Sequence, residues 1–360
     1  MKRALIAMSG GVDSSVAALL LQREGWDCSG VTLRLVRGSD LALPGHRSCC
    51  TPEDAEEAAY ICYQLGISHD LLDLSGLFRV RVMQHFADEY ARGHTPNPCI
   101  DCNRYLKFEA LLDWALGEGY DALATGHYAR VTRDEASGRF QLRKAADESK
   151  DQSYVLAMLT QRQLAHLRFP LGELRKTEVR AIAEESGLVN ARKHDSQDIC
   201  FVPDGDYAAF LERWRGEPFP HGALLDESGR VLGEHRGAIR YTVGQRRGLG
   251  FAAGERIYVT GKDMARNTVT LGPEEALYSR TLLASGFHWL SIPVPEGPLR
   301  VCARTRYRQR EQPAVVRALS GGRIELVFDA PQRAVTPGQA VVLYDGELVL
   351  GGGTIETVMK

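Results

Sequence analysis

The chain has 360 residues, too many for one typical hydrophobic core, so two or three domains are expected. Lysine and arginine number 44 against 46 acidic residues, so any nucleic-acid binding must come from local basic patches. No apolar run approaches the length of a membrane span, and eight cysteines in so long a chain argue against a secreted disulfide framework. No apolar signal region precedes the first predicted strand, so the cytoplasm is the expected compartment and no membrane partner is expected.

Strand-like and helix-like segments alternate from residue 1 to about residue 202, which predicts a parallel sheet covered by helices on both faces. The expected strands cover residues 3–8, 28–33, 69–74 and 121–125. The first expected helix begins near residue 16, and three more cover residues 52–65, 78–90 and about 107–116. Ligands of such sheets bind beyond the carboxyl ends of the strands, so the segments after the strands are the first candidates for a site.

The first of these segments is Ser9-Gly10-Gly11-Val12-Asp13-Ser14-Ser15. Two glycines let the backbone approach a ligand closely, and a helix N-terminus favours an anion. The loop has no lysine to reach a γ-phosphate, so it suits pyrophosphate or an α-phosphate under attack. The alternative is an ordinary turn between strand and helix.

Gly126 and His127 follow the predicted strand at 121–125, so both are expected to face the same crevice as this loop. For His127 the alternative is a hydrogen-bonded structural histidine at the end of the strand.

The cysteines form a second signal. Cys99 and Cys102 follow Thr95-Pro96-Asn97-Pro98, whose prolines predict an extended loop before the helix at about 107–116. Cys102 would lie near the N-terminus of that helix, which lowers a thiol pKa and favours a nucleophilic thiolate. Cys200 ends a polar stretch that begins at Lys193. The alternative, a small buried hydrophobic residue, fits Cys28, Cys62 and Cys302, and the pair Cys49-Cys50 stays ambiguous.

The rest of the chain changes character twice. Residues 204–277 begin with an aromatic helix, 207–214, and continue as short strands with a donor-rich loop at Arg240, Arg246 and Arg247, either for a phosphate backbone or as a solvated surface loop. Residues 278–360 read as short strands with Gly and Pro turns, which predicts a small β-barrel. Within it, a strand would project Arg304, Arg306, Arg308 and Arg310 from one face, as a phosphate track or as an exposed strand.

These motifs resemble a known family. The loop at Ser9–Ser14 resembles the S-G-G-x-D-S loop of the PP-loop ATP pyrophosphatases. The segments at 95–103, 124–128, 150–154, 195–201 and 242–250 are similar, in the same order, to those of the tRNA-specific 2-thiouridylases. The resemblance covers essentially the whole chain. It implies an α/β fold with a parallel-sheet PP-loop domain at 1–203, a central tRNA-contacting domain at 204–277 and a C-terminal β-barrel at 278–360.

The resemblance also implies roles for single residues. The expected catalytic residues are Cys102 and Cys200. The expected ATP-binding residues are Ala7, Met8, Ser9, Gly10, Gly11, Val12, Asp13, Ser14, Leu33 and Gly126. The expected tRNA contacts are Asn97, Pro98, Cys99, His127, Lys150, Asp151, Gln152, Arg306, Tyr307 and Gln339.

The implied reaction replaces the C2 oxygen of the wobble uridine, U34, with sulfur in the lysine, glutamate and glutamine tRNAs. ATP with Mg²⁺ adenylates that oxygen and releases pyrophosphate, and AMP leaves when sulfur arrives. Cys200 receives a persulfide from a sulfur-carrier protein or a cysteine desulfurase relay. Cys102 then either releases hydrosulfide from that persulfide, forming a disulfide with Cys200, or helps the sulfur onto C2.

One position departs from the family pattern, because Cys99 stands where many members have aspartate. Cys99, Cys102 and Cys200 supply three thiolates, enough for a [4Fe–4S] cluster with one open iron. The persulfide route and the cluster route both stay open. Two other functions are also considered: a PP-loop ligase acting on a small metabolite, and a non-enzymatic iron–sulfur or RNA-binding protein.

Overall fold

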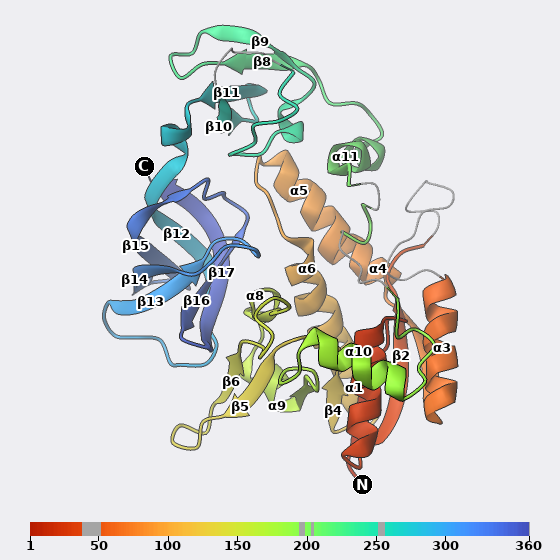
Figure 1. Ribbon diagram of the computed structural model, residues 1–360. Helices are drawn as coiled ribbons and strands as arrows, with labels where there is room; N and C mark the ends of the chain where they lie inside the picture. The colour runs from red at the N-terminus through yellow and green to blue at the C-terminus, as the bar shows by residue number, and fades with distance from the viewer. Residues whose placement is uncertain (38–51, 194–198, 203–204, 251–255, 360) are drawn as a thin grey trace.

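The computed structural model describes residues 1–37, 52–193, 199–202, 205–250 and 256–359. Cys49, Cys50 and the motif residues Asp195, Ser196 and Gln197 lie outside the described residues. Figure 1 shows an α/β region, a small four-stranded sheet and a β-barrel, as the sequence predicts.

The N-terminal region is built on a five-stranded parallel sheet with the strand order β3-β2-β1-β4-β7. Its strands are β1 (Arg3–Ala7), β2 (Asp27–Arg34), β3 (Ser68–Asp73), β4 (Ala122–Ala124) and β7 (Leu167–Arg168). Side chains alternate between two cores, because Leu5 packs into one hydrophobic cluster and Ala4 and Ile6 into another. The sheet is therefore buried on both faces, as parallel sheets are.

The helices around this sheet include the four predicted segments. They are α1 (Val12–Arg23), α3 (Pro52–Leu65), α4 (Ser75–Phe78), α5 (His85–Ala91), α6 (Pro98–Asp101), α7 (Leu111–Gly117), α8 (Ser153–Leu156), α9 (Gln161–His166) and α10 (Lys176–Glu185). Of these, α8, α9 and α10 are additional to the predicted segments. The π-helical turns η1 (Arg79–Gln84) and η2 (Cys102–Ala110) join α4 to α5 and α6 to α7, so residues 75–91 and 98–117 form two long helices.

The second long helix corrects one expectation. The sequence predicts an extended loop up to about residue 107, but the helix begins at Pro98, with Asn97 as its N-cap. The Asn97 side chain accepts a hydrogen bond from the backbone N–H of Cys99 at 3.1 Å. A proline in the first helical position needs no hydrogen-bond partner for its nitrogen, so it starts a helix as readily as it fixes a loop.

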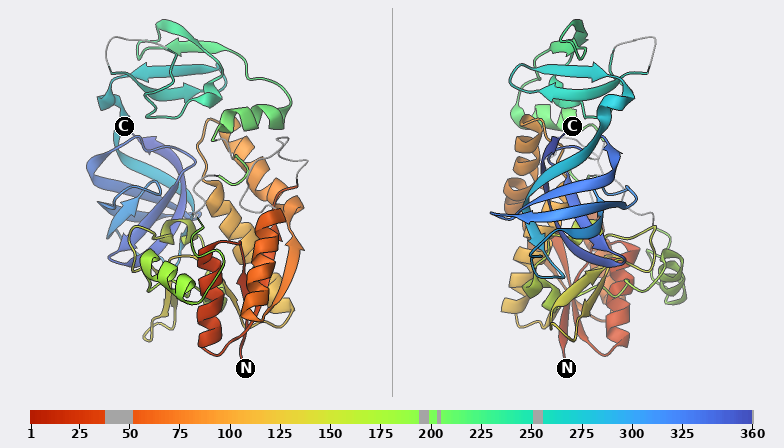
Figure 2. Two further views of the ribbon diagram at one scale, coloured as in Figure 1. Left: turned by 45° about the vertical axis from the view of Figure 1, so that its right-hand side comes forward. Right: turned by 90° about the vertical axis from the view of Figure 1, so that its left-hand side faces the viewer.

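Helix α11 (Tyr207–Arg215), close to the predicted 207–214, leads into the four-stranded sheet with the order β10-β11-β8-β9. Its strands are β8 (Gly222–Leu225), β9 (Val231–His235), β10 (Tyr258–Asp263) and β11 (Thr268–Gly272), with short 3₁₀ turns η3 (Ala238–Arg240) and η4 (Glu274–Leu277). Figures 1 and 2 place this sheet at the top of the molecule, above helix α5 and the barrel.

The C-terminal strands close into a barrel, because β12 pairs with both β15 and β17. They are β12 (Tyr278–Trp289), β13 (Leu299–Arg304), β14 (Gln312–Leu319), β15 (Arg323–Arg333), β16 (Ala340–Asp345) and β17 (Leu348–Met359). A hairpin from the N-terminal region, β5 (Arg130–Arg133) and β6 (Phe140–Arg143), joins this sheet where Arg143 pairs with Leu348. The hairpin was not predicted.

The predicted strand of alternating arginines is wrong. Strand β13 ends at Arg304, and the backbone turns away because Gln309 accepts hydrogen bonds from both the N–H and the hydroxyl of Thr305, at 2.8 and 2.7 Å. The Arg304 guanidinium turns inward to Asp151 and Glu311. Arg306, Arg308 and Arg310 are exposed on the loop that follows.

Candidate active site

The loop after β1 has the shape of an anion cradle. Helix α1 begins at Val12 without a side-chain cap, so the first-turn N–H groups have no side-chain acceptor. Ser14 fixes the loop: its Oγ accepts from the Ser9 N–H at 3.2 Å and donates to the Gly11 carbonyl at 3.0 Å. Gly10 has a φ of +68°, and an added Cβ would lie 2.7 Å from the Asp54 carbonyl oxygen. Only glycine fits this close approach.

The structure brings a lysine to this loop that the sequence did not indicate. The Lys176 Nζ donates to both carboxylate oxygens of Asp13, each at 2.7 Å, and the Lys176 side chain is 10 % exposed. The Tyr128 hydroxyl donates to the same carboxylate at 2.8 Å. Lys176 is the first residue of α10, which packs beside α1. This helix was not predicted, and no local pattern shows where its first side chain points.

Gly126 borders the cradle, in keeping with the prediction that it faces the same crevice. A Cβ on Gly126 would lie 2.7 Å from the carbonyl carbon of Asp13 and 2.8 Å from the backbone nitrogen of Ser14. The end of β4 therefore touches the start of α1 with no room for a side chain. Leu33, the other distant ATP candidate, is buried at the end of β2.

His127 lies in the core rather than in the crevice. Its ring packs near Phe108 and Phe169, at centroid distances of 5.6 and 6.0 Å, and its Nδ1 bonds the Thr125 hydroxyl at 2.7 Å. Burial, together with the positive charge of Lys107, holds the pKa of His127 well below its usual value. These contacts favour the structural interpretation of His127 over the expected contact with tRNA.

Two of the candidate thiols lie on helix α6 and its extension. Cys99 is exposed in the first turn, at the positive end of the helix, whereas Cys102 lies one turn further on and packs against the hydrophobic core. The Asn103 side chain donates to the Val155 carbonyl at 3.3 Å, which ties this helix to α8. Cys99, not Cys102 as the sequence predicts, is thus the thiol nearest the helix N-terminus.

Cys200 is positioned by its neighbour. The Phe201 ring is buried among Phe78, Phe86 and Phe210, at centroid distances of 5.1 to 5.7 Å. Cys200 itself is half-buried and packs against the same core cluster as Cys102. Within the described parts of the chain, no three Cys, His, Asp or Glu side chains come close enough together to hold a metal ion.

The chain segment that leads to Cys200 is tied to the cradle by two residues that the sequence did not single out. The buried Asn190 side chain donates to the Gly10 carbonyl and to the Ser15 hydroxyl, each at 3.0 Å. Lys193 donates to the Gly10 carbonyl at 3.3 Å and to Asp54 at 2.8 Å, and it pairs with Glu57. The sequence shows that these two side chains can form hydrogen bonds, but it does not show which groups they bond.

The residues expected to contact tRNA fall into two groups. Tyr307 and Cys99 are exposed and Lys150 is half-buried; partial burial raises the pKa of Tyr307. Asp151, by contrast, is buried and accepts hydrogen bonds from Ala145, Ser153 and Arg304.

Three further candidates already have protein partners. The Gln152 side chain accepts from the Tyr128 N–H at 2.9 Å. The Gln339 amide donates to the Thr95 carbonyl at 2.6 Å, which fastens the loop before α6 to the barrel. The exposed Arg306 donates to the Arg333 carbonyl. These contacts give each of them a structural role.

Comparison with known proteins supplies the family. A tRNA methyl transferase HUP domain model matches residues 2–204, a PRC-barrel domain model of the same group matches 208–273, and an aminomethyltransferase beta-barrel domain model matches 279–355. A tRNA-specific 2-thiouridylase MnmA from Acetivibrio thermocellus is 46% identical over 99% of both chains. The chain belongs to the tRNA-specific 2-thiouridylase family. It is therefore a sulfurtransferase that thiolates tRNA.

A second 2-thiouridylase, from Pelotomaculum thermopropionicum, is 47% identical over 99% of this chain and 97% of its own. Among solved structures, a 4-thiouridine synthetase–RNA complex with bound ATP overlaps 59% of this chain and 50% of its own, at 20% identity and a TM-score of 0.38. In the described parts of this 2-thiouridylase, no helix has the length and apolar character needed to cross a bilayer.

Proposed function

We propose that this 2-thiouridylase uses ATP to adenylate the C2 oxygen of the wobble uridine, U34, in the lysine, glutamate and glutamine tRNAs and replaces that oxygen with sulfur. One observation carries the proposal: the phosphate cradle is linked by contacts to the thiol-bearing helix. Tyr128 bonds Asp13 through its hydroxyl at 2.8 Å, and its backbone exchanges hydrogen bonds with Gln152, both at 2.9 Å. Gln152 precedes α8, and α8 is bonded to Asn103, next to Cys102.

The cradle suits the triphosphate of ATP, with the first-turn N–H groups of α1, Gly10, Gly11, Ser9 and Ser14 as donors. Lys176 supplies the positive charge that the loop itself lacks. In this proposal the uridine C2 oxygen attacks the α-phosphorus, the bond to the β-phosphate breaks, and pyrophosphate leaves. The N–H groups and Lys176 stabilise the charge that develops on the phosphates.

Mg²⁺ fits this site through a single carboxylate. Magnesium bound with a nucleotide takes one or two protein carboxylates and completes its shell with phosphates and water. Asp13 is the carboxylate at the cradle, and both of its oxygens now contact Lys176. When bound, the ion would neutralise phosphate charge; Asp13 would hold it, and Lys176 would turn to the phosphates.

For the sulfur step we propose that Cys200 carries the persulfide and that Cys102 is the nucleophile. The Cys102 thiolate attacks the Cys200 sulfur that bears the terminal SH, forming a Cys102–Cys200 disulfide and releasing hydrosulfide. Hydrosulfide adds to C2, AMP leaves with the former C2 oxygen, and a dithiol reductant restores both thiols. The persulfide would come from a protein donor, either a sulfur carrier or a cysteine desulfurase relay.

An iron–sulfur cluster does not fit the described residues. A [4Fe–4S] cluster needs three thiolates converging on one space, and Cys99, Cys102 and Cys200 do not form such a group in the structure. Cys99 is on the exposed first turn, whereas Cys102 and Cys200 pack against the core.

We propose the division into a PP-loop domain at 1–203, a central tRNA-contacting domain at 204–277 and a barrel at 278–360. The family models end and begin near these positions. The hairpin β5–β6 belongs by sequence to the first domain but pairs with the barrel. We assign the exposed Arg306 and Tyr307 and the half-buried Lys150 to tRNA.

The test measures AMP, pyrophosphate and 2-thiouridine with purified enzyme, ATP, a sulfur donor and unmodified tRNA. AMP and 2-thiouridine should form only with tRNA present; turnover with a small amine and none with tRNA would instead indicate a metabolite ligase. Cys102→Ser and Cys200→Ser should each abolish 2-thiouridine, and Cys302→Ser, a half-buried thiol in β13, should not.

The iron assay separates the two sulfur routes. Enzyme purified without oxygen should be colourless, free of iron and fully active, and Cys99→Asp should still thiolate tRNA. Activity that scales with bound iron, and is lost in Cys99→Asp, would reject the persulfide route in favour of a cluster.

A further inference from the structure

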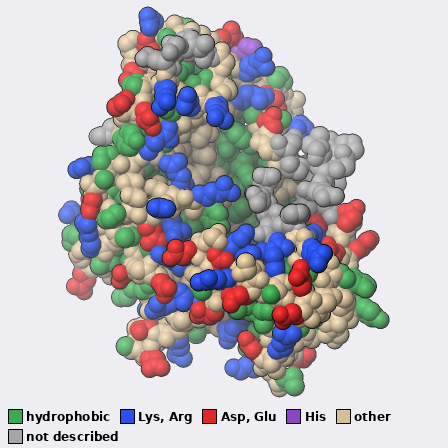
Figure 3. All heavy atoms as spheres, in the orientation of Figure 1, with side chains coloured by type: hydrophobic (Ala, Val, Ile, Leu, Met, Phe, Trp, Pro, Cys, Tyr) green, Lys and Arg blue, Asp and Glu red, His purple; other side chains and the backbone are tan. Residues whose placement is uncertain are grey.

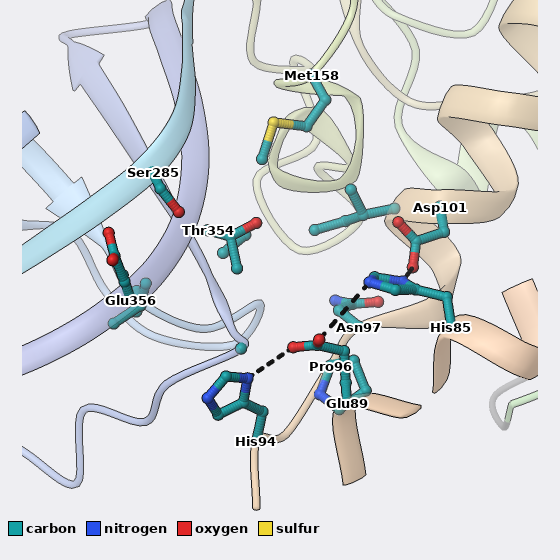
Figure 4. A pocket seen from close by; sticks show the side chains of 14 residues that line it. His85, Glu89, His94, Pro96, Asn97, Asp101, Met158, Ser285, Thr354 and Glu356 are labelled. Carbon is teal, nitrogen blue, oxygen red and sulfur yellow. Dashed lines mark hydrogen bonds and ion pairs between the residues drawn. The ribbon is translucent and has the colours of Figure 1, made fainter. Parts of the chain in front are cut away.

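A cavity lies beside helix α6, which carries Cys99. It is bounded by α5 and α6 on one side and by the barrel strands β12 and β17 on the other (Figure 4). Its volume is about 320 Å³, within the range of pockets that hold small organic groups. Asn97, Ile100 and Asp101 line it from the helix. With 3.6 residues per turn, these positions share one helix face and Cys99 and Cys102 the opposite one. The cavity is therefore separate from the reacting thiols.

The side chains that line the cavity include both apolar and hydrogen-bonding groups, which suits a flat heterocycle. Pro96, Met158 and Ile355 supply apolar surface. Ser285 and Thr354, which pair across β12 and β17, supply hydroxyls, and Figure 4 shows the Asn97 amide nitrogen directed into the space. The Asn97 oxygen is already used by the Cys99 N–H, so the amide is fixed as a donor.

Glu89 and Asp101, two of the three carboxylates that line the cavity, are paired with neighbouring side chains. Glu89 bonds His94 at 2.7 Å and Arg92 at 2.5 Å, and Asp101 bonds His85 at 2.9 Å (Figure 4). Glu89 and Asp101 are thus already engaged by protein partners, and Glu356 on β17 adds a third carboxylate to the wall. Their negative charge disfavours a phosphate. What remains to be recognised is a neutral group with hydrogen-bonding edges.

The surroundings point to RNA as the source of that group. Figure 3 shows the molecule hollowed at its centre, between the elements that Figure 1 places on either side, with Lys and Arg side chains around the hollow. A basic rim around an interior that carries carboxylates and hydroxyls lets a phosphate backbone stay outside while an uncharged base enters. Proteins read single-stranded RNA loops in this manner, by accepting bases that are splayed out of the stack.

We propose that this cavity, the rear cavity of α6, binds the nucleobase of an anticodon-loop nucleotide next to the target uridine. The inference rests on the proposed function and adds a subsite to it. The target uridine must meet the thiols on one face of α6, so a base held on the opposite face is a neighbour in the loop. Its binding would fix the RNA on both sides of the helix and contribute to the choice of tRNA.

The test combines a filled cavity with RNA that lacks one base. Thr354→Phe places a ring in the cavity, Ser285→Leu is a second filling variant, and Thr357→Phe puts the same ring on the exposed part of β17 as a control. Substrates are anticodon stem–loop RNAs, intact or with a single abasic nucleotide at each loop position outside the target. Initial rates of 2-thiouridine formation give kcat/KM, and circular dichroism melting checks folding.

With wild type, one abasic position should lower kcat/KM about tenfold or more, as expected for the loss of one well-recognised base. Thr354→Phe and Ser285→Leu should show a similar loss on intact RNA and no further loss at that abasic position, and Thr357→Phe should behave as wild type.

The inference is overturned if both filling variants melt like wild type and thiolate intact RNA at the wild-type rate. It is also overturned if the abasic loss persists in full in the filled variants, or if filling raises the KM of the sulfur donor and not that of the RNA. Absence of 2-thiouridine from wild type with intact RNA would instead reject the proposed function.

Discussion

Replacing Lys176 with methionine tests the assignment of this residue to the phosphates. The substitution removes a cation whose Nζ lies 2.7 Å from both oxygens of Asp13, at the mouth of the cradle. Removing one preorganised donor from a developing charge typically lowers kcat by about 10²–10³, or about 2.7–4 kcal/mol. We expect a loss of this size in AMP release with saturating ATP and tRNA.

The stability cost of the same change is smaller. Asp13 keeps the Tyr128 hydroxyl and its side chain is 30 % exposed, so the lost charged hydrogen bonds should cost about 1–3 kcal/mol of unfolding free energy. Arg130→Met is the matched control, because it removes a similarly buried cation from an ion pair with Glu347 outside the cradle. Lys176→Arg should recover part of the lost activity.

The assay is the initial rate of AMP and pyrophosphate release, with thermal melting of each variant measured beside it. Wild-type AMP release by a folded Lys176→Met enzyme would refute the assignment. So would an equal loss in Arg130→Met, since the effect would then follow from stability alone. A double variant with Asp13→Asn should lose less than the sum of the single losses, because the two side chains act as a pair.

Three further outcomes are expected. Gly126→Ala should abolish AMP release while the enzyme still folds, because its Cβ would meet the Asp13 backbone at 2.7 Å. Burial lowers the pKa of Lys262 to about 8, and its Nζ has no hydrogen-bond partner among the residues that the structure describes. Lys262→Met should therefore raise the melting temperature at pH 7, and by progressively less from pH 8 to 10.5. Burial raises the pKa of Cys28 and Cys62 to about 11, so iodoacetamide at pH 7.5 should leave both unmodified in the native enzyme, as mass spectrometry of peptides would show.

The sign of the Lys262 effect follows from proton binding. Between pH 8 and 10.5 the folded protein holds fewer protons at this residue than the unfolded chain, so wild-type stability rises with pH and the advantage of methionine shrinks. An advantage that grows with pH would contradict it. Native labelling of Cys62, and AMP release by Gly126→Ala at the wild-type rate, would contradict the other two expectations.

Much of the fold follows from local pattern. The parallel sheet was predicted from the alternation of apolar runs of strand length with helical segments that have acidic first turns and end at glycines. Helix α3 has the predicted bounds, 52–65. The cradle was recognisable because its residues are adjacent in sequence, and backbone N–H groups at a helix start need no distant partner. The helix that carries Cys99 starts earlier than predicted because Asn97 before Pro98 favours a helix start as well as a loop.

The phosphate cradle, the cysteine-bearing motifs and the family are thus determined by sequence alone, because each depends on residues close together in the chain. Tertiary structure decided which side chains meet: Lys176 reaches Asp13 across 163 positions, and Gln339 fastens Thr95 across 244. It also turned Arg304 inward to Asp151, which ended the expected arginine strand. Charged and amide side chains find partners wherever the fold brings one within about 3 Å, and no local pattern records that distance.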